Sequence, residues 1–157
     1  MFLRWIALAA LVFVLDQATK YAALKYLARN EIAVAPFLNL ILTYNSGAAF
    51  GFLNNAGGWQ NTFFITVAVV VSAMLVYMLR QLRSDQRWVA VALMLVLGGA
   101  LGNLLDRIRF GHVVDFIDFY YGSWHWYTFN IADAAITVGA FILVFDALGL
   151  AARKKPA

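Results

Sequence analysis

Four long apolar runs, separated by short polar or aromatic segments, constrain the fold of this chain more than any other feature. A helix needs about 20 predominantly apolar residues to cross a bilayer. Of the 157 residues, 64% are hydrophobic and only 13% are charged, whereas a soluble domain has roughly 25% charged residues. The sequence therefore predicts an integral membrane protein, all-α in its spanning part, with one domain of residues 1–157. The expected spans are residues 3–24, 61–79, 88–105 and 131–150.

The first apolar run is interpreted as a retained span. Arg4 precedes a short hydrophobic core, as in a secretory signal, but no small-residue cleavage site follows it. Helical character instead continues through Asp16 and Lys20 to about Leu24. We expect a helix whose far end is polar.

Basic residues predict the orientation of the chain. In an arrangement of four spans they collect at the N-terminus, in the link after the second span and in the C-terminal tail, which all lie on one side. Positively charged segments stay in the cytoplasm, so both termini are expected there and the two longer loops outside. The residues concerned are Arg4, Arg80, Arg83, Arg87, Arg153, Lys154 and Lys155.

The two outer segments differ in character. After Pro36, residues 37–45 are rich in strand formers, and glycines such as Gly47 and Gly51 supply turns. This predicts a small extracytoplasmic β element on the membrane surface. Residues 111–133 form the second segment, an outer loop dense in Trp, Tyr and Phe. Such aromatics are typical of a membrane interface, and they are also candidates for the wall of a cleft.

Two carboxylates bracket the aromatic segment, Asp115 near its start and Asp133 at its end. A charged residue in a span costs on the order of 3 kcal/mol, which makes each one a functional candidate. Two neighbouring carboxylates can share one proton, so that one activates water as a base and the other donates a proton as an acid. We interpret Asp115 and Asp133 as a catalytic pair.

Simpler interpretations compete with catalysis at several polar residues. Asp133 is also a helix N-terminal acid favoured by the helix dipole, although that does not explain Asn130 three residues before it. Asp16 and Lys20, four residues apart, are expected to form a structural ion pair. Asp118 is a weaker candidate, expected at the interface.

The segment GGALGNLLDR combines a close-approach glycine surface with polar residues one turn apart. Asn103 and Arg107 either orient a carboxylate or bind substrate carbonyls; alternatively, Arg107 extends to the interface. Asp106 is expected to support Arg107 or to face solvent. His112 and His125 are expected to be interfacial or structural.

Missing residue types exclude several kinds of site. Without cysteine the chain has no disulfide, thiolate ligand or cysteine nucleophile, and its 2 histidines cannot form a histidine-rich metal site. No HExxH, P-loop or GxGxxG motif is present, so we expect no metal and no cofactor. The net charge of +4 comes mostly from bases at the ends of apolar runs, which does not favour nucleic-acid binding.

Five sequence blocks follow one another along the chain: DQATK (16–20), YNSGAAF (44–50), GGALGNLLDR (98–107), GHVVDFID (111–118) and FNIAD (129–133). In this order they resemble the bacterial lipoprotein signal peptidases, the signal peptidase II family. The resemblance implies a hydrolase of the cell inner membrane with four spans and an active site facing the periplasm. It implies an aspartic endopeptidase that cleaves prolipoproteins on the amino side of a diacylglyceryl-modified cysteine.

The same resemblance assigns roles to individual positions. It implies that Asp115 and Asp133 are catalytic, that residues 37–52 build most of a periplasmic β-cradle, and that Asp16 and Lys20 support the fold and site. The expected partners are diacylglyceryl-prolipoproteins, membrane lipid and the inhibitor globomycin. The substrate-binding or dyad-supporting positions are Asn45, Gly47, Asn103, Arg107 and Asn130.

Two other functions fit a small polar membrane protein. A proton-coupled transporter also uses charged residues in spans, but here they gather at one boundary, and the two halves show no repeat. A noncatalytic scaffold predicts that the aspartates are dispensable.

Overall fold

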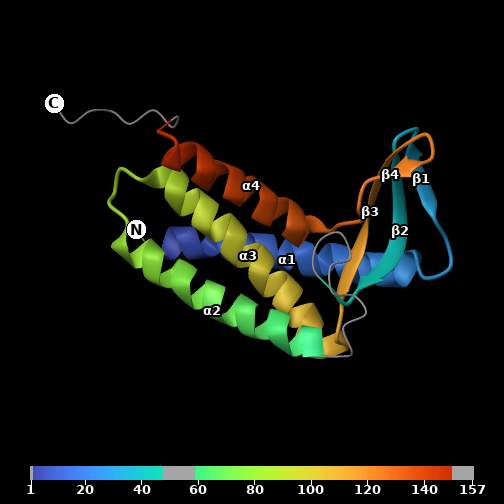
Figure 1. The fold of residues 1–157 in the computed structure, drawn as a ribbon, viewed down its shortest axis with the longest axis horizontal. Helices are drawn as coiled ribbons and strands as arrows, with labels where there is room; N and C mark the ends of the chain where they lie inside the picture. The colour runs from blue at the N-terminus through green and yellow to red at the C-terminus, as the bar shows by residue number, and fades with distance from the viewer. Residues whose placement is uncertain (1, 48–58, 150–157) are drawn as a thin grey trace.

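In the computed structural model, four helices form a bundle and a small sheet projects from one end of it (Figure 1). The structure describes residues 2–47 and 59–149. Residues 48–52 of the expected β element and the basic tail lie outside the described residues. The elements are α1 (Phe2–Tyr26), β1 (Ile32–Ala35), β2 (Leu38–Asn45), α2 (Trp59–Gln81), α3 (Arg87–Phe110), β3 (Val113–Tyr121), β4 (Trp124–His125) and α4 (Ile131–Ala147).

Three of the helices are long and apolar enough to cross a membrane. They are α1 from Trp5, α2 and α3, with 22, 23 and 24 residues. The described part of α4 has 17 residues, fewer than the roughly 20 that a span needs. The structure thus identifies three candidate spans among the described residues, with α4 as a shorter fourth helix.

Helix α3 is the centre of the bundle, because α1, α2 and α4 all pack against it. Glycines permit two of these approaches. A Cβ atom on Gly98 would lie 2.6 Å from the backbone oxygen of Ala9 in α1, and one on Gly99 would lie 2.5 Å from that of Ala132 in α4. The predicted glycine surface is therefore confirmed, and adjacent glycines bring α1 and α4 close to α3, where α1 and α4 also contact each other.

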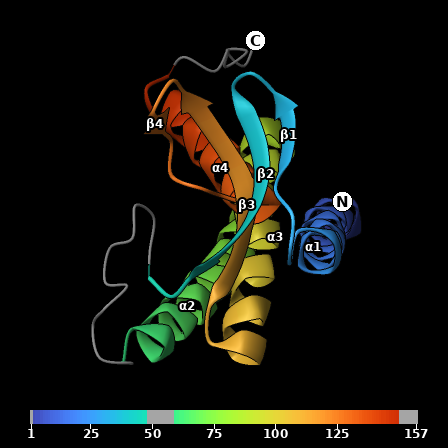
Figure 2. The same cartoon turned by 90° about the vertical axis from the view of Figure 1, so that its right-hand side faces the viewer.

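The sheet is antiparallel throughout, in the order β1-β2-β3-β4. Figure 2 shows β2 and β3 side by side across the end of the bundle. Their pairing runs from Leu38 opposite Phe119 to Asn45 opposite Val113, so it joins residues that are 68 to 81 positions apart in the chain.

The expected outer aromatic loop is largely strand instead. Residues 113–121 form β3, the longest strand described. The loop prediction failed because the aromatic content was interpreted as an interfacial belt, while the β-branched and aromatic residues of VVDFIDFYY favour a pleated strand once β2 supplies hydrogen-bond partners. The all-α description is therefore too simple, since the outer part of the chain is a sheet built from both outer segments.

Candidate active site

Asp115 and Asp133 reach the site from different elements, β3 and the first turn of α4, and Asn130 contacts both. The Asn130 Nδ2 group donates to Asp115 Oδ1 at 2.6 Å. The Asn130 Oδ1 atom accepts from the Asp133 backbone N–H at 2.9 Å, and the Asp133 carboxylate accepts from the Asn130 N–H at 3.3 Å. This reciprocal pair is a capping box, which fixes the start of α4. One asparagine thus begins the helix and orients both acids.

Asn103 of α3 connects the pair to the bundle. Its Nδ2 group donates to Asp133 Oδ1 at 2.8 Å. Its Oδ1 atom accepts from Asn130 Nδ2 at 3.1 Å and from Lys20 Nζ at 2.8 Å. Because Asn103 donates with one end and accepts with the other, its amide orientation is determined by these neighbours.

Asp115 has an unusual protonation equilibrium. Asp115 is buried, with only 1% of its surface exposed. Burial, and then the neighbouring charge of Asp133, raise the pKa of Asp115 to about 7, against opposing hydrogen bonds from Asn45 and Asn130 and the positive charge of Lys20. At neutral pH, Asp115 is therefore poised between the acid and its carboxylate.

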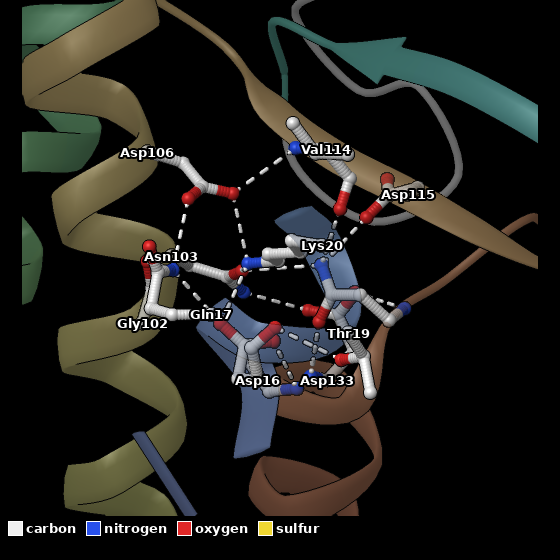
Figure 3. A network of polar contacts seen from close by, with 12 residues as sticks. Asp16, Gln17, Thr19, Lys20, Gly102, Asn103, Asp106, Val114, Asp115 and Asp133 are labelled. Carbon is white, nitrogen blue, oxygen red and sulfur yellow. Dashed lines mark hydrogen bonds and ion pairs between the residues drawn. The ribbon is translucent and has the colours of Figure 1, made fainter. Parts of the chain in front are cut away.

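A buried ionic cluster lies beside the two acids (Figure 3). Lys20 Nζ is 2.9 Å from Asp16 Oδ2 and 2.8 Å from Asp106 Oδ2. All three residues are at most 2% exposed. The expectation that Asp106 faces solvent was wrong, because it is buried and its ion-pair partner is Lys20; its charge also acts on Arg107.

Each acid of this cluster holds the backbone next to one member of the pair. Asp16 Oδ1 accepts from the N–H of Ala132 at 2.9 Å, directly before Asp133. Asp106 Oδ2 accepts from the N–H of Val114 at 3.1 Å, directly before Asp115. The ionic cluster therefore holds both strand and helix in position relative to α1 and α3.

Sequence reasoning missed Asp106 and Gln17 as parts of this site. Gln17 Nε2 donates to Asp106 Oδ1 at 3.0 Å and to Asp16 Oδ2 at 3.2 Å. The signal for Asp106 was available, since it lies three residues after Asn103 and so shares a helix face with it.

Arg107 and the turn after β2 form the other side of the site. Arg107 Nη2 donates to the backbone oxygen of Gly47 at 2.7 Å, and its guanidinium lies 5.0 Å from the ring centre of Phe64. Asn45 Oδ1 accepts from the Gly47 N–H at 3.0 Å. Arg107 thus turns toward the site and not toward the membrane interface.

A cavity of about 520 Å³ opens at this site. Its polar wall includes Asp133, Asn103 and Arg107, and Asp115 is not among its lining residues. Pockets of 300–1,000 Å³ with a mostly apolar lining and a few polar groups are typical of substrate sites. The other side chains of the wall are Asn45, Val113, Trp126, Tyr127, Phe129, Ala134, Ile136, Thr137 and Val138.

The remaining sequence candidates lie away from this cavity. Asp118 is buried, 2% exposed, and not interfacial as expected. Its Oδ2 atom lies 2.9 Å from Nδ1 of the exposed His125. His112 packs against the ring of Tyr44, 4.6 Å between centres. No group of three or more potential metal-binding side chains occurs within residues 2–47 and 59–149.

Comparison with known proteins identifies the family. The family model described as signal peptidase (SPase) II matches residues 8–149. The chain belongs to the signal peptidase II family. It is 48% identical to the lipoprotein signal peptidase of Paraburkholderia phymatum over 145 residues, covering 92% of this chain and 87% of that relative. The same protein from Burkholderia mallei has the same identity and coverage.

Solved structures agree with this assignment. Two bacterial membrane enzymes, determined by the in meso method at 2.3 and 1.9 Å, are each 34% identical to the chain. The first has a TM-score of 0.82, with 98% of this chain and 93% of that chain covered. The second has a TM-score of 0.78 and a coverage of 92% of each. The comparisons support a signal peptidase and not the proton-coupled transporter.

Proposed function

We propose that this chain is an aspartic endopeptidase that removes the signal peptide from diacylglyceryl-modified prolipoproteins on the amino side of the lipidated cysteine. The observation that carries the proposal is the contact of Asn130 with both Asp115 and Asp133 beside a cavity of about 520 Å³. Family membership supplies the reaction class. The two carboxylates supply a chemistry that performs it.

The two acids divide the work according to their surroundings. Asp133 lies in the cavity wall, where a water molecule has access to it. It acts as the base that takes a proton from this water as the oxygen attacks the scissile carbonyl carbon. Asp115, with a pKa raised to about 7, is the acid that protonates the carbonyl oxygen. A proton then passes to the leaving nitrogen and the C–N bond breaks.

Polar groups beside the dyad are suited to hold an extended peptide. Asn45, Gly47 and Arg107 form one side of the site. Arg107 lines the cavity, and within the described part of the chain its buried Nε atom has no hydrogen-bond partner, so we expect its guanidinium to bind a substrate carbonyl when the site is occupied. Trp126 and Phe129 line the cavity opposite these groups, where they exclude bulk water. We expect globomycin to compete for the same cavity.

We further propose that the segment of residues 131–150, which includes α4, is a fourth span in the cell inner membrane and that both termini are cytoplasmic. Helix α4 lies along α3 in the bundle (Figure 1). Arg80 near the end of α2, Arg83 in the α2–α3 link and Arg87 at the start of α3 lie where these two helices are joined, at the end opposite the sheet. By the positive-inside rule this end is cytoplasmic, and the cavity beside Asp133 faces the periplasm. Acyl chains of the substrate then remain in lipid while its peptide enters the cavity.

The test is cleavage of a lipidated prolipoprotein by purified variants in detergent. Asp115→Asn and Asp133→Asn preserve side-chain size, and each is expected to lower turnover by at least a thousandfold. Asp85→Asn, a matched change in the exposed α2–α3 link, is expected to retain wild-type turnover. Normal cleavage by either dyad variant would overturn the assignment. Thermal unfolding of each variant separates lost chemistry from lost fold.

A further inference from the structure

A second cavity lies at the end of the bundle opposite the active site. Its volume is about 410 Å³, and it is formed by the start of α1, the end of α2, the α2–α3 link and the start of α3. None of the residues of the catalytic region lines it. In Figure 1 this end is where α2 and α3 are joined, far from the sheet.

The polar wall of this cavity is strongly basic. Arg80, Arg83 and Arg87 line it, and no acid does so among the described residues. Arg83 is held by Asp85, 2.7 Å away, but that pair is exposed, with side chains 76% and 62% accessible. Exposed pairs contribute little, so Asp85 offsets only part of the positive charge.

The cavity lining also includes apolar residues. Leu79 and Ala90 line the cavity and belong to the buried core of the bundle, 6% and 3% exposed. Trp5 of α1 flanks them and packs against the same core. A ligand here therefore meets arginines as well as hydrocarbon and an aromatic ring, which suits an amphiphile better than a free anion.

The start of α3 adds to the attraction for an anion. Gln86, its N-cap, makes no side-chain hydrogen bond to the helix N-terminus. Its side-chain oxygen accepts instead from the backbone N–H of Arg83 at 3.1 Å. The positive end of the α3 dipole therefore lies at the cavity without a side-chain cap from Gln86.

We propose that this cavity binds the phosphate headgroup of an anionic glycerophospholipid, with its glycerol and upper acyl carbons against Leu79, Ala90 and Trp5. Basic pockets between membrane helices on the cytoplasmic side suit such headgroups. The arginines also orient the chain in the membrane, but orientation requires only their charge. It does not require a cavity with an apolar wall beside that charge.

The experiment measures lipid retention by native mass spectrometry of detergent-purified full-length protein. In detergent the membrane orientation has no influence, so this function of the arginines does not affect the result. Phosphatidylglycerol is compared with zwitterionic phosphatidylcholine. The wild type is expected to retain phosphatidylglycerol at least fivefold more strongly. Equal retention of both lipids would overturn the proposal.

Matched variants locate the binding. Arg87→Gln at the start of α3 is expected to lose several-fold in phosphatidylglycerol retention, whereas Arg109→Gln, an exposed arginine near the other end of α3, is expected to lose none. Equal losses would show nonspecific charge and refute the site. Asp85→Asn is expected to increase retention, because it releases Arg83. Soluble glycerol 3-phosphate is expected to compete weakly; displacement equal to that by the lipid would indicate a free-phosphate site instead.

Discussion

The hydrogen bond from Asn130 to Asp115 allows a prediction about the pH dependence of activity: its loss should shift the profile to higher pH. At 2.6 Å and in a buried position, it stabilises the charged form of Asp115. A hydrogen bond to a charged group is worth about 1.5–3 kcal/mol, and 1.36 kcal/mol corresponds to one pKa unit. Removing it should therefore raise the pKa of Asp115, from about 7, by roughly one to two units.

Asn130→Ser removes this contact, together with the bonds from the same amide to Asn103 Oδ1 and the Val114 backbone oxygen, which are not bonds to a carboxylate. Serine is a good N-cap, so the start of α4 is preserved. Its side chain has no amide group and is too short to replace the donor to Asp115. If Asp115 is the protonated acid, activity is lost on the alkaline side when this proton leaves. The alkaline limb of kcat should therefore move upward by about one to two pH units, although the maximal rate falls.

The assay is cleavage of a lipidated prolipoprotein between pH 5 and 10, with each profile normalised to its own maximum. Thr137→Ala is the control, since Thr137 lines the cavity without a hydrogen bond to either acid among those described. Its limbs should coincide with those of the wild type. An alkaline limb of Asn130→Ser that stays in place or moves down would refute the assignment of Asp115 as the acid.

Other predictions concern stability and the sheet. Lys20→Met leaves two buried carboxylates without their cation and should lower the free energy of unfolding by about 3–5 kcal/mol. Asp16→Asn keeps one ion pair and should lower it less. Denaturant unfolding in detergent compares the two variants. The folded state binds a proton at Asp115 that the unfolded chain lacks between pH 3.8 and about 7, so stability should fall as pH rises through this window. Asp115→Asn should lose that dependence and unfold at a higher temperature than the wild type at pH 8. His125→Phe should lower the melting temperature by removing the contact with Asp118, while His125→Asn, which keeps a donor near Nδ1, should restore much of it.

The helices were predictable because their signal is strong and local. Runs of about 20 apolar residues identify spans from the sequence alone, and Gly98 and Gly102 marked the packing surface. The approach of Asp115 to Asp133 was also expected, since both flank one segment. Their contacts with Asn130 and Asn103 follow from helical spacing and from the N-cap position.

The sheet and the ionic cluster were harder to predict because they depend on pairing between distant segments. Strand β3 adopts its extended conformation by pairing with β2, which lies roughly 70 to 80 residues earlier in the chain. No local sequence pattern identifies such a distant partner. Asp106 illustrates the same difficulty, since its neighbour in sequence, Arg107, was the obvious cation. The actual cation, Lys20, belongs to the first helix.

The hydrogen bond between the Asp16 carboxylate and the N–H of Ala132 spans 116 residues. It joins α1 to α4, the first and the last of the described helices along the chain. Asp115 likewise depends on distant segments, because its strand β3 pairs with β2 and the N–H of Val114 donates to Asp106 of α3. Under the proposed mechanism, the earlier helices enter the bilayer during synthesis without a complete catalytic pair. Proteolytic activity then requires the docking of α4, which carries Asp133, so a chain without docked α4 is expected to be inert toward the membrane proteins around it.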